Sequence, residues 1–175
     1  MLSALDHRTH MSRRQYEWMR QRGYPLPGIT TLQTWLANFV VRPLSCDLQM
    51  RLLKKMMAPL SPKERTCVLM YDEMDMMRLA TYDAQLDQVL GPHKHLQVFM
   101  AGGIFTGWKL PVMYGFDQPV TKELLLDLIL AMEGAGARVV ATVSDMGGAN
   151  LGVWRQLGVA HDGETAFENP ADPSR

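Results

Sequence analysis

The chain has 175 residues, which is enough for one domain with a substantial core and a small appendage. Hydrophobic residues make up 47% and charged residues 21%, as in ordinary globular proteins. The 18 basic and 18 acidic residues cancel, which counts against a free-standing DNA-binding domain, since such domains are usually basic overall. The charge is uneven, because residues 1–65 hold eleven Lys or Arg against four Asp or Glu.

The cysteine content and the hydropathy of the sequence indicate the cellular compartment of the protein. Cys46 and Cys67 show neither metal-ligand spacing nor a disulfide framework, so a reducing compartment is expected. No apolar run approaches the roughly 20 residues needed to span a bilayer. The N-terminus is too charged for a secretory signal. The sequence therefore predicts a soluble intracellular protein with no membrane partner.

The first segment, residues 1–60, is predicted to be helical and helix-turn-helix-like. Hydrophobic spacing favours short helices over 12–22, 31–40 and 46–58, with a stiff Pro- and Gly-rich connector at 23–28. A small helical support for the main domain is the alternative. Its basic residues are the candidates for contact with a DNA backbone, with an ordinary solvated surface as the default: Arg13, Arg14, Arg20, Arg22, Lys54 and Lys55.

Beyond the boundary at Pro59–Arg65 the pattern changes to strands, and a core over 66–160 is predicted. The expected order is strands at 67–71, 79–82, 95–104 and 108–116, a helix at 121–136, a strand at 137–145 and a helix at 147–158. Residues 86–94 are expected to form a turn region, and Pro111 argues for an edge strand or a bulge. The last segment, residues 161–175, is expected to be an irregular polar tail.

Two of these strands run into aspartates, Asp72 and Asp145. A right-handed crossover through the helix at 121–136 would make the two strands parallel neighbours, about 4.8 Å apart. Carboxylates that close repel each other unless a divalent cation lies between them, and oxygen ligands suit Mg²⁺ or Mn²⁺. Two such ions can activate water and stabilise the leaving oxygen of a phosphodiester. The alternatives are a solvated turn at Asp72 and a helix N-cap at Asp145.

Other candidate ligands carry less weight. Glu73 and Asp75 are expected to face solvent or to support a ligand, with Glu73 the substitute if Asp72 points inward. His93 and His95 have no third ligand nearby, which favours surface or strand-start histidines. Neither glycine pair of the core is followed by Lys and Ser or Thr, so no nucleotide-binding residues are expected.

Four segments in order resemble the ribonuclease H-like core of P element-type transposases, including their THAP-domain relatives: "YPLPGITTLQTWL", "LMYDEM", "FMAGGIFTGWKLPVMYGF" and "GARVVATVSDMGGANLGVWRQLG". The resemblance covers about residues 12–175. It implies an α/β fold, an incomplete ribonuclease H-like mixed sheet flanked by helices and preceded by a small helical segment. It also implies DNA cleavage and strand transfer, with Asp72 and Asp145 as the first two acids of a D-D-D/E set that binds Mg²⁺ or Mn²⁺, DNA as partner and a nuclear location.

The sequence departs from the family in what it lacks. The third acid, the inserted GTP-binding domain and the rest of the core are absent, and two cysteines cannot build the family's zinc module. A fragment, an alternative product or a decayed copy is expected, inactive alone, with an exposed sheet edge beside Val139–Val143. Self-association or pairing with a full-length transposase follows as an expectation. The alternative function is a non-catalytic, transposon-derived module that binds DNA or protein.

Overall fold

The computed structural model describes residues 4, 8, 11–37, 41–84, 87–160 and 162–175. The chain forms two compact units, Met1–Val40 and Val41–Arg175. Among the described residues, no helix is long and apolar enough to cross a membrane. Both cysteines, Cys46 and Cys67, are free.

The first unit contains α2 (Arg13–Gln21) and α3 (Ile29–Ala37), where helices were predicted. Ser12 begins α2 with a capping box, in which its hydroxyl accepts from the Gln15 N–H at 3.2 Å and the Gln15 side chain accepts from the Ser12 N–H at 2.9 Å. Tyr16 is fully buried against Leu32, and its hydroxyl donates to the Pro27 carbonyl at 2.9 Å. Residues 38–40 of the second predicted helix lie outside the described residues.

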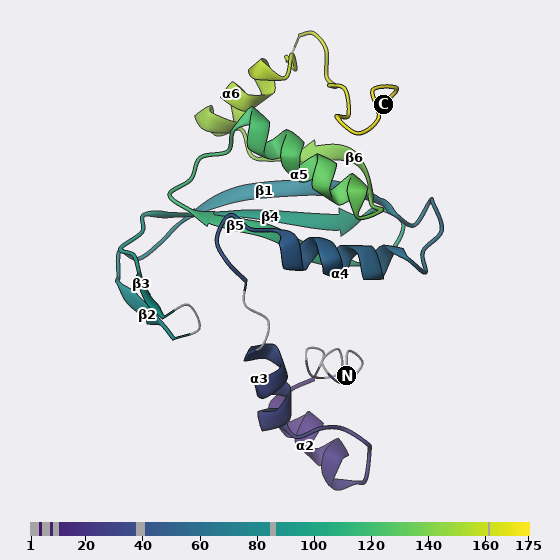
Figure 1. Ribbon diagram of the computed structural model, residues 1–175, viewed down its shortest axis with the longest axis vertical. Helices are drawn as coiled ribbons and strands as arrows, with labels where there is room; N and C mark the ends of the chain where they lie inside the picture. Colours follow the sequence, from purple (N-terminus) through teal and green to yellow (C-terminus); the bar gives the residue numbers. More distant parts are fainter. Residues whose placement is uncertain (1–3, 5–7, 9–10, 38–40, 85–86, 161) are drawn as a thin grey trace. The chain divides into compact units, whose positions relative to one another are not determined.

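The second unit is built on a four-stranded mixed sheet in the order β5-β4-β1-β6 (Figure 1). β1 pairs antiparallel with β4, β4 pairs antiparallel with β5, and β6 joins the other side of β1 in parallel. The strands are β1 (Thr66–Asp75), β4 (His95–Gly103), β5 (Lys109–Phe116) and β6 (Arg138–Val143). The predicted parallel pair and the mixed sheet are confirmed.

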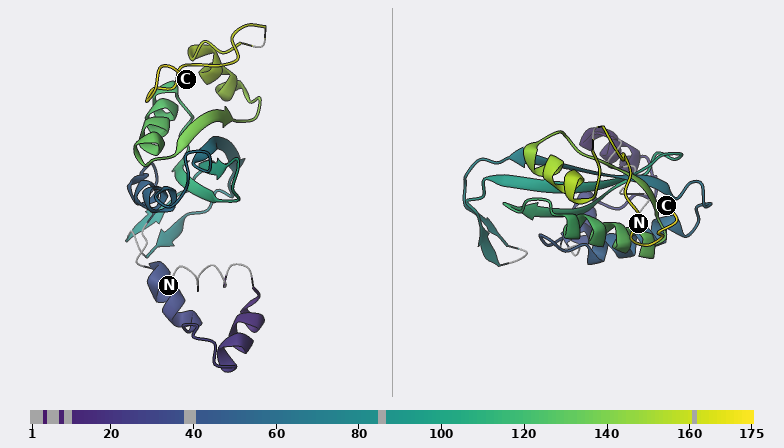
Figure 2. Two further views of the ribbon diagram at one scale, coloured as in Figure 1. Left: turned by 90° about the vertical axis from the view of Figure 1, so that its right-hand side faces the viewer. Right: turned by 90° about the horizontal axis from the view of Figure 1, so that it is seen from above.

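Two helices cover one face of this sheet, α4 (Asp47–Met57) and α5 (Lys122–Gly134) (Figure 2). The buried side chains of these helices and the inward-facing residues of the strands form one core: Leu53, Met57, Leu125, Leu128, Ile129 and Met132 with Cys67, Leu69, Phe99, Ala101 and Val112. Full burial of a large apolar side chain stabilises a fold by about 1.5–3 kcal/mol. The last helix, α6 (Gly148–Gln156), follows β6 and adds Val153 to the core. The flanked mixed sheet is therefore the predicted α/β fold.

Two details of the strands differ from the prediction. β1 was expected to end at Tyr71, but it continues to Asp75 because β4 keeps pairing with it, with Asp72 opposite Val98. Residues 86–94, expected as a turn region, contain β3 (Gln88–Leu90), which pairs with β2 (Thr81–Asp83) in a separate hairpin. Pro111 lies at a register irregularity of the edge strand β5, as predicted.

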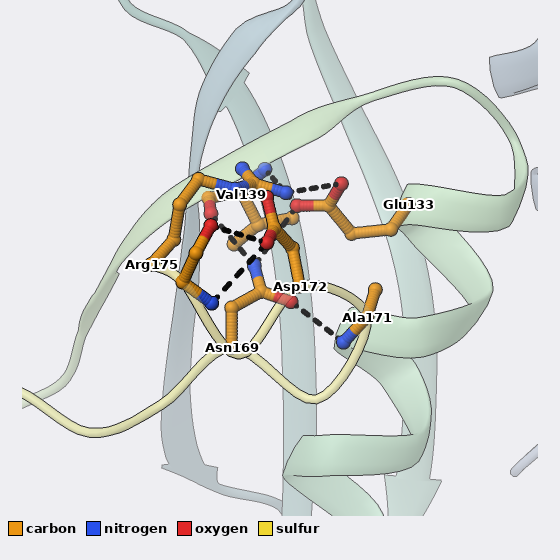
Figure 3. Close-up of polar contacts among 7 residues, drawn as sticks. Glu133, Val139, Asn169, Ala171, Asp172 and Arg175 are labelled. Carbon is orange, nitrogen blue, oxygen red and sulfur yellow. Dashed lines mark hydrogen bonds and ion pairs between the residues drawn. The ribbon is translucent and has the colours of Figure 1, made fainter.

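The described residues of the tail beyond α6 form no helix or paired strand, but Glu133, at the end of α5, fixes the tail to the core (Figure 3). The Glu133 carboxylate accepts from the Val139 N–H at 2.9 Å and from the Asn169 amide at 3.0 Å, and pairs with Arg175 at 3.1 Å. The Asn169 amide also donates to the Val139 carbonyl at 3.2 Å. These contacts, which we call the tail lock, cover the outer edge of β6 at its start. Val143, at its end, stays half exposed.

Candidate functional site

The parallel pairing of β1 with β6 places the two predicted acids at the same end of two neighbouring strands. The last paired residues are Met70 and Val143, and Asp72 and Asp145 each lie two positions further along their chains. Both are exposed. Within the ranges that the structure describes, no group of three or more His, Cys, Asp or Glu residues has a metal-binding arrangement. The candidate site is therefore limited to two carboxylates at the carboxyl end of a parallel strand pair.

Asp72 is held by the sheet itself. It lies within β1 rather than after its end, opposite Val98, and its backbone carbonyl accepts from the Gln97 side-chain amide at 2.9 Å. Gln97 is only 3% exposed, so this hydrogen bond explains an amide side chain inside an apolar core. The Asp72 Oδ1 atom accepts from the Glu73 N–H at 2.9 Å, while Oδ2 accepts no hydrogen bond from the described residues. One carboxylate oxygen is thus available to a cation.

Asp145 lies in the loop between β6 and α6 and is held by the helix. Its Oδ1 atom accepts from the Gly147 N–H at 3.1 Å and from the Asn150 side-chain amide at 2.5 Å. Oδ2 again accepts none from the described residues. Gly147, not Asp145, is the N-cap residue of α6, which corrects the N-cap alternative. A Cβ at Gly147 would lie 3.1 Å from Asp145 Oδ1, so the close approach of backbone and carboxylate suits glycine.

The backbone of Asp145 has a second support. The Trp154 indole N–H donates to the Ser144 hydroxyl at 3.2 Å, and this hydroxyl donates to the Asp145 carbonyl at 3.0 Å. Next to it, the buried Tyr71 hydroxyl approaches Ser144 without forming a hydrogen bond of good geometry. Burial raises the pKa of Tyr71. The nearby Ser144 side chain lowers this pKa and the Asp145 carboxylate raises it, each by less than burial does. The phenol therefore stays neutral beside the acids.

The acids and histidines that were weighed as weaker candidate ligands contact one another or other residues. Glu73 and Asp75 contact His95 Nδ1 at 2.9 and 3.1 Å. His93 contacts Asp117 at 2.9 Å and stacks on the Phe116 ring. The backbone N–H of His95, and then the His93 side chain, lower the pKa of Asp117 to about 2. His95 thus begins β4 and His93 lies two residues before it. Asp72 is exposed rather than turned inward, so the condition under which Glu73 would replace it is not met.

The candidate DNA-contacting residues are all exposed, but they belong to both compact units. Arg20 pairs with Glu17 at 3.0 Å and Arg22 covers the Trp18 ring at 4.0 Å. The other candidates have no ion pair within the described residues: Arg13 and Arg14 in α2, and Lys54 and Lys55 in the last turn of α4.

An open, mainly apolar groove of about 680 Å³ runs between β6, α6 and the tail, lined in part by Val140, Met146, Leu151, Trp154 and Phe167. Basic side chains are nearly absent from this lining, with Arg155 as the exception. The groove therefore offers little to a phosphate group.

Sequence reasoning missed Gln97 and Asn150, the two amides that support the acids. Gln97 had a local signal, since it is the single amide among the alternating apolar residues of β4. Asn150 had none beyond its position five residues after Asp145, because a contact at that spacing depends on how the chain turns into α6.

The comparisons with known proteins agree with this fold. Residues 45–158 match the family described as TNP-like, RNase H N-terminal domain. Over 159 residues the chain is 31% identical to Transposable element P transposase of Drosophila melanogaster, covering 91% of this chain and 21% of that protein. The fold is similar to that of the Drosophila P element transposase strand transfer complex, with a TM-score of 0.76 and 30% identity, covering 93% of this chain and 36% of that one.

The chain thus spans about a fifth of the curated relative and about a third of the solved chain. Because the family match covers more than half of its residues, the chain belongs to the TNP-like family and carries the RNase H N-terminal domain of that family.

Proposed function

We propose that this chain is part of the catalytic core of a metal-dependent DNA transposase of the DDE/D type, which cleaves phosphodiesters and transfers DNA strands. Asp72 and Asp145 are the two acids that it supplies. The observation that carries the proposal is the register of β1 and β6, in which both acids follow the last paired residues by the same two positions. The similarity to the P element transposase supports the same reaction.

The donor set fits a hard divalent cation, Mg²⁺ or Mn²⁺. Each acid uses Oδ1 for a hydrogen bond with its own neighbourhood and leaves Oδ2 without one among the described residues. Oxygen ligands with open positions are what these ions prefer. A bound cation would supply Lewis acidity for activating a water or hydroxyl nucleophile. The chain's own contribution is to hold two carboxylate oxygens at one sheet edge.

DNA is the proposed partner, and nuclear location follows from the proposed reaction. Arg13, Arg14, Lys54 and Lys55 are exposed and free of acidic partners in the described residues, so they are the side chains best able to contact phosphates. Pairing through the outer edge of β6, with a second copy or with a full-length transposase, stays a prediction. The non-catalytic alternative has no observation of its own in its favour.

A calorimetric titration with Mn²⁺ tests the site. We expect the chain to bind Mn²⁺, and Asp72→Ala or Asp145→Ala to abolish that binding. Asp127→Ala removes an exposed acid from α5 and is the matched control, which should bind as the parent does. Binding that both site variants retain would remove the chemical basis of the proposal.

Because the described residues supply two acids rather than three, the chain alone is expected not to nick supercoiled plasmid in Mg²⁺ or Mn²⁺. Nicking that Asp72→Ala removes would overturn this expectation and show that two acids suffice.

A further inference from the structure

The first turns of α6 hold Asp145 by both its carboxylate and its backbone. Asn150 donates to the carboxylate, and Trp154 acts on the backbone through the Ser144 hydroxyl. Residues four apart lie on the same face of a helix. One face of α6 is therefore turned to the loop that carries the second acid.

The two carboxylate oxygens of Asp145 differ in their hydrogen bonds. Both donors, the Gly147 N–H and the Asn150 amide, meet Oδ1. With the Gly147 N–H alone, the carboxylate could still rotate about its Cβ–Cγ bond, since that torsion is broad. A second donor from a different direction restricts this rotation and leaves Oδ2 as the outward oxygen.

We propose that Asn150 is a positioning residue that fixes the Asp145 carboxylate so that Oδ2 is presented to a divalent cation. This inference rests on the proposed function. It assigns the support of the second acid to a neutral amide on the following helix. A neutral donor suits the task, because a Lys or Arg in its place would compete with the cation for the carboxylate.

A purely structural role makes a different prediction. If the hydrogen bond only secured the start of α6, its loss would lower the melting temperature and leave cation affinity unchanged. Outer partners of metal ligands instead change affinity by about 10- to 100-fold when they are removed. Melting and Mn²⁺ affinity together therefore separate the two roles.

The test compares Mn²⁺ affinity by calorimetry in the whole chain and in Asn150→Leu, which keeps the size of the side chain and removes the donor. We expect affinity to fall about 10-fold. Thr121→Ala is the matched control, because it removes a hydrogen bond at the start of α5, where the Thr121 hydroxyl accepts from the Leu124 N–H at 3.2 Å. It should lower the melting temperature and leave Mn²⁺ affinity at the parent value.

Asn150→Ser gives an independent reading, since its shorter side chain cannot span the same distance, and it should lose affinity as well. Unchanged affinity in a folded Asn150→Leu or Asn150→Ser, while Asp145→Ala abolishes binding, would overturn the positioning role and leave the proposed function intact. If the parent and Asp145→Ala behave alike, the proposed function fails and this inference fails with it.

Discussion

The two candidate acids lie at one edge of the sheet but are held in different ways. Asp72 is inside a strand, paired with β4 on one side, and its backbone is fixed by a buried glutamine. Asp145 is in a loop, and side chains of the next helix hold it. The first acid is therefore positioned by the same interactions that make the core, and the second by contacts that the core does not need. Substitutions near Asp72 should change stability, and those near Asp145 should change the site.

The largest expected loss of stability comes from removing the tail lock at the start of β6. Glu133→Ala removes the acceptor shared by Val139, Asn169 and Arg175. Arg175 keeps its ion pair with Asp172, and Asn169 keeps its hydrogen bond to the Val139 carbonyl. The loss of three hydrogen bonds to one carboxylate, each contributing about 1 kcal/mol, should lower the free energy of unfolding by about 3 kcal/mol. Chemical denaturation should show this loss, with m-values checked for two-state behaviour. A change of a few tenths of a kcal/mol would show that the tail lock contributes little.

A smaller loss of stability is expected when the hydrogen bond to the Asp72 backbone is removed. Gln97→Leu removes the hydrogen bond to the Asp72 carbonyl and should lower the free energy of unfolding by about 1 kcal/mol. Gln49→Leu is the matched control, because Gln49 is also buried but makes no such bond. If Gln97→Leu weakened Mn²⁺ binding more than Asn150→Leu does, the contrast between the two acids would be wrong.

The smallest expected effect is on the pH dependence of stability, through the Asp117 carboxylate, which contacts the start of β4. The pKa of Asp117 is lowered to about 2 by the His95 N–H and by His93. A carboxyl with a lowered pKa stabilises the fold above its unfolded-state pKa, and that contribution is lost as the pH falls from about 4 to about 2. Asp117→Asn should make stability over this window less dependent on pH, measured by thermal melting. An unchanged pH profile would assign the acid sensitivity to other groups.

The sequence was sufficient for the elements that have a local pattern or follow from a topological rule. The buried face of α5 leaves a helical period, β6 is rich in β-branched residues, and the parallel pairing of β1 with β6 follows from the right-handed crossover through α5. The hairpin of β2 and β3 was harder, because Tyr82 and Val89 are exposed and give no such signal. The extension of β1 to Asp75 depends on its partner β4, which lies outside the local window.

Side-chain contacts between distant residues were beyond the sequence for the same reason. The tail was predicted to be irregular, and nothing in the sequence indicated that Glu133 and Arg175 meet across 42 positions. Asp72 and Asp145 could be selected because each follows a recognisable run of apolar or β-branched residues. Which oxygen of each carboxylate is left open depends on Glu73, Gly147 and Asn150, and only the folded arrangement shows it.

The most direct test of a shared cation site is a crystal structure of the chain with Mn²⁺, using anomalous scattering to locate the ion. We predict one anomalous peak within ligand distance of Oδ2 of both Asp72 and Asp145, with Asn150 still bound to Oδ1 of Asp145. A peak that contacts only one of the two acids, or no peak between them at saturating Mn²⁺, would contradict the account.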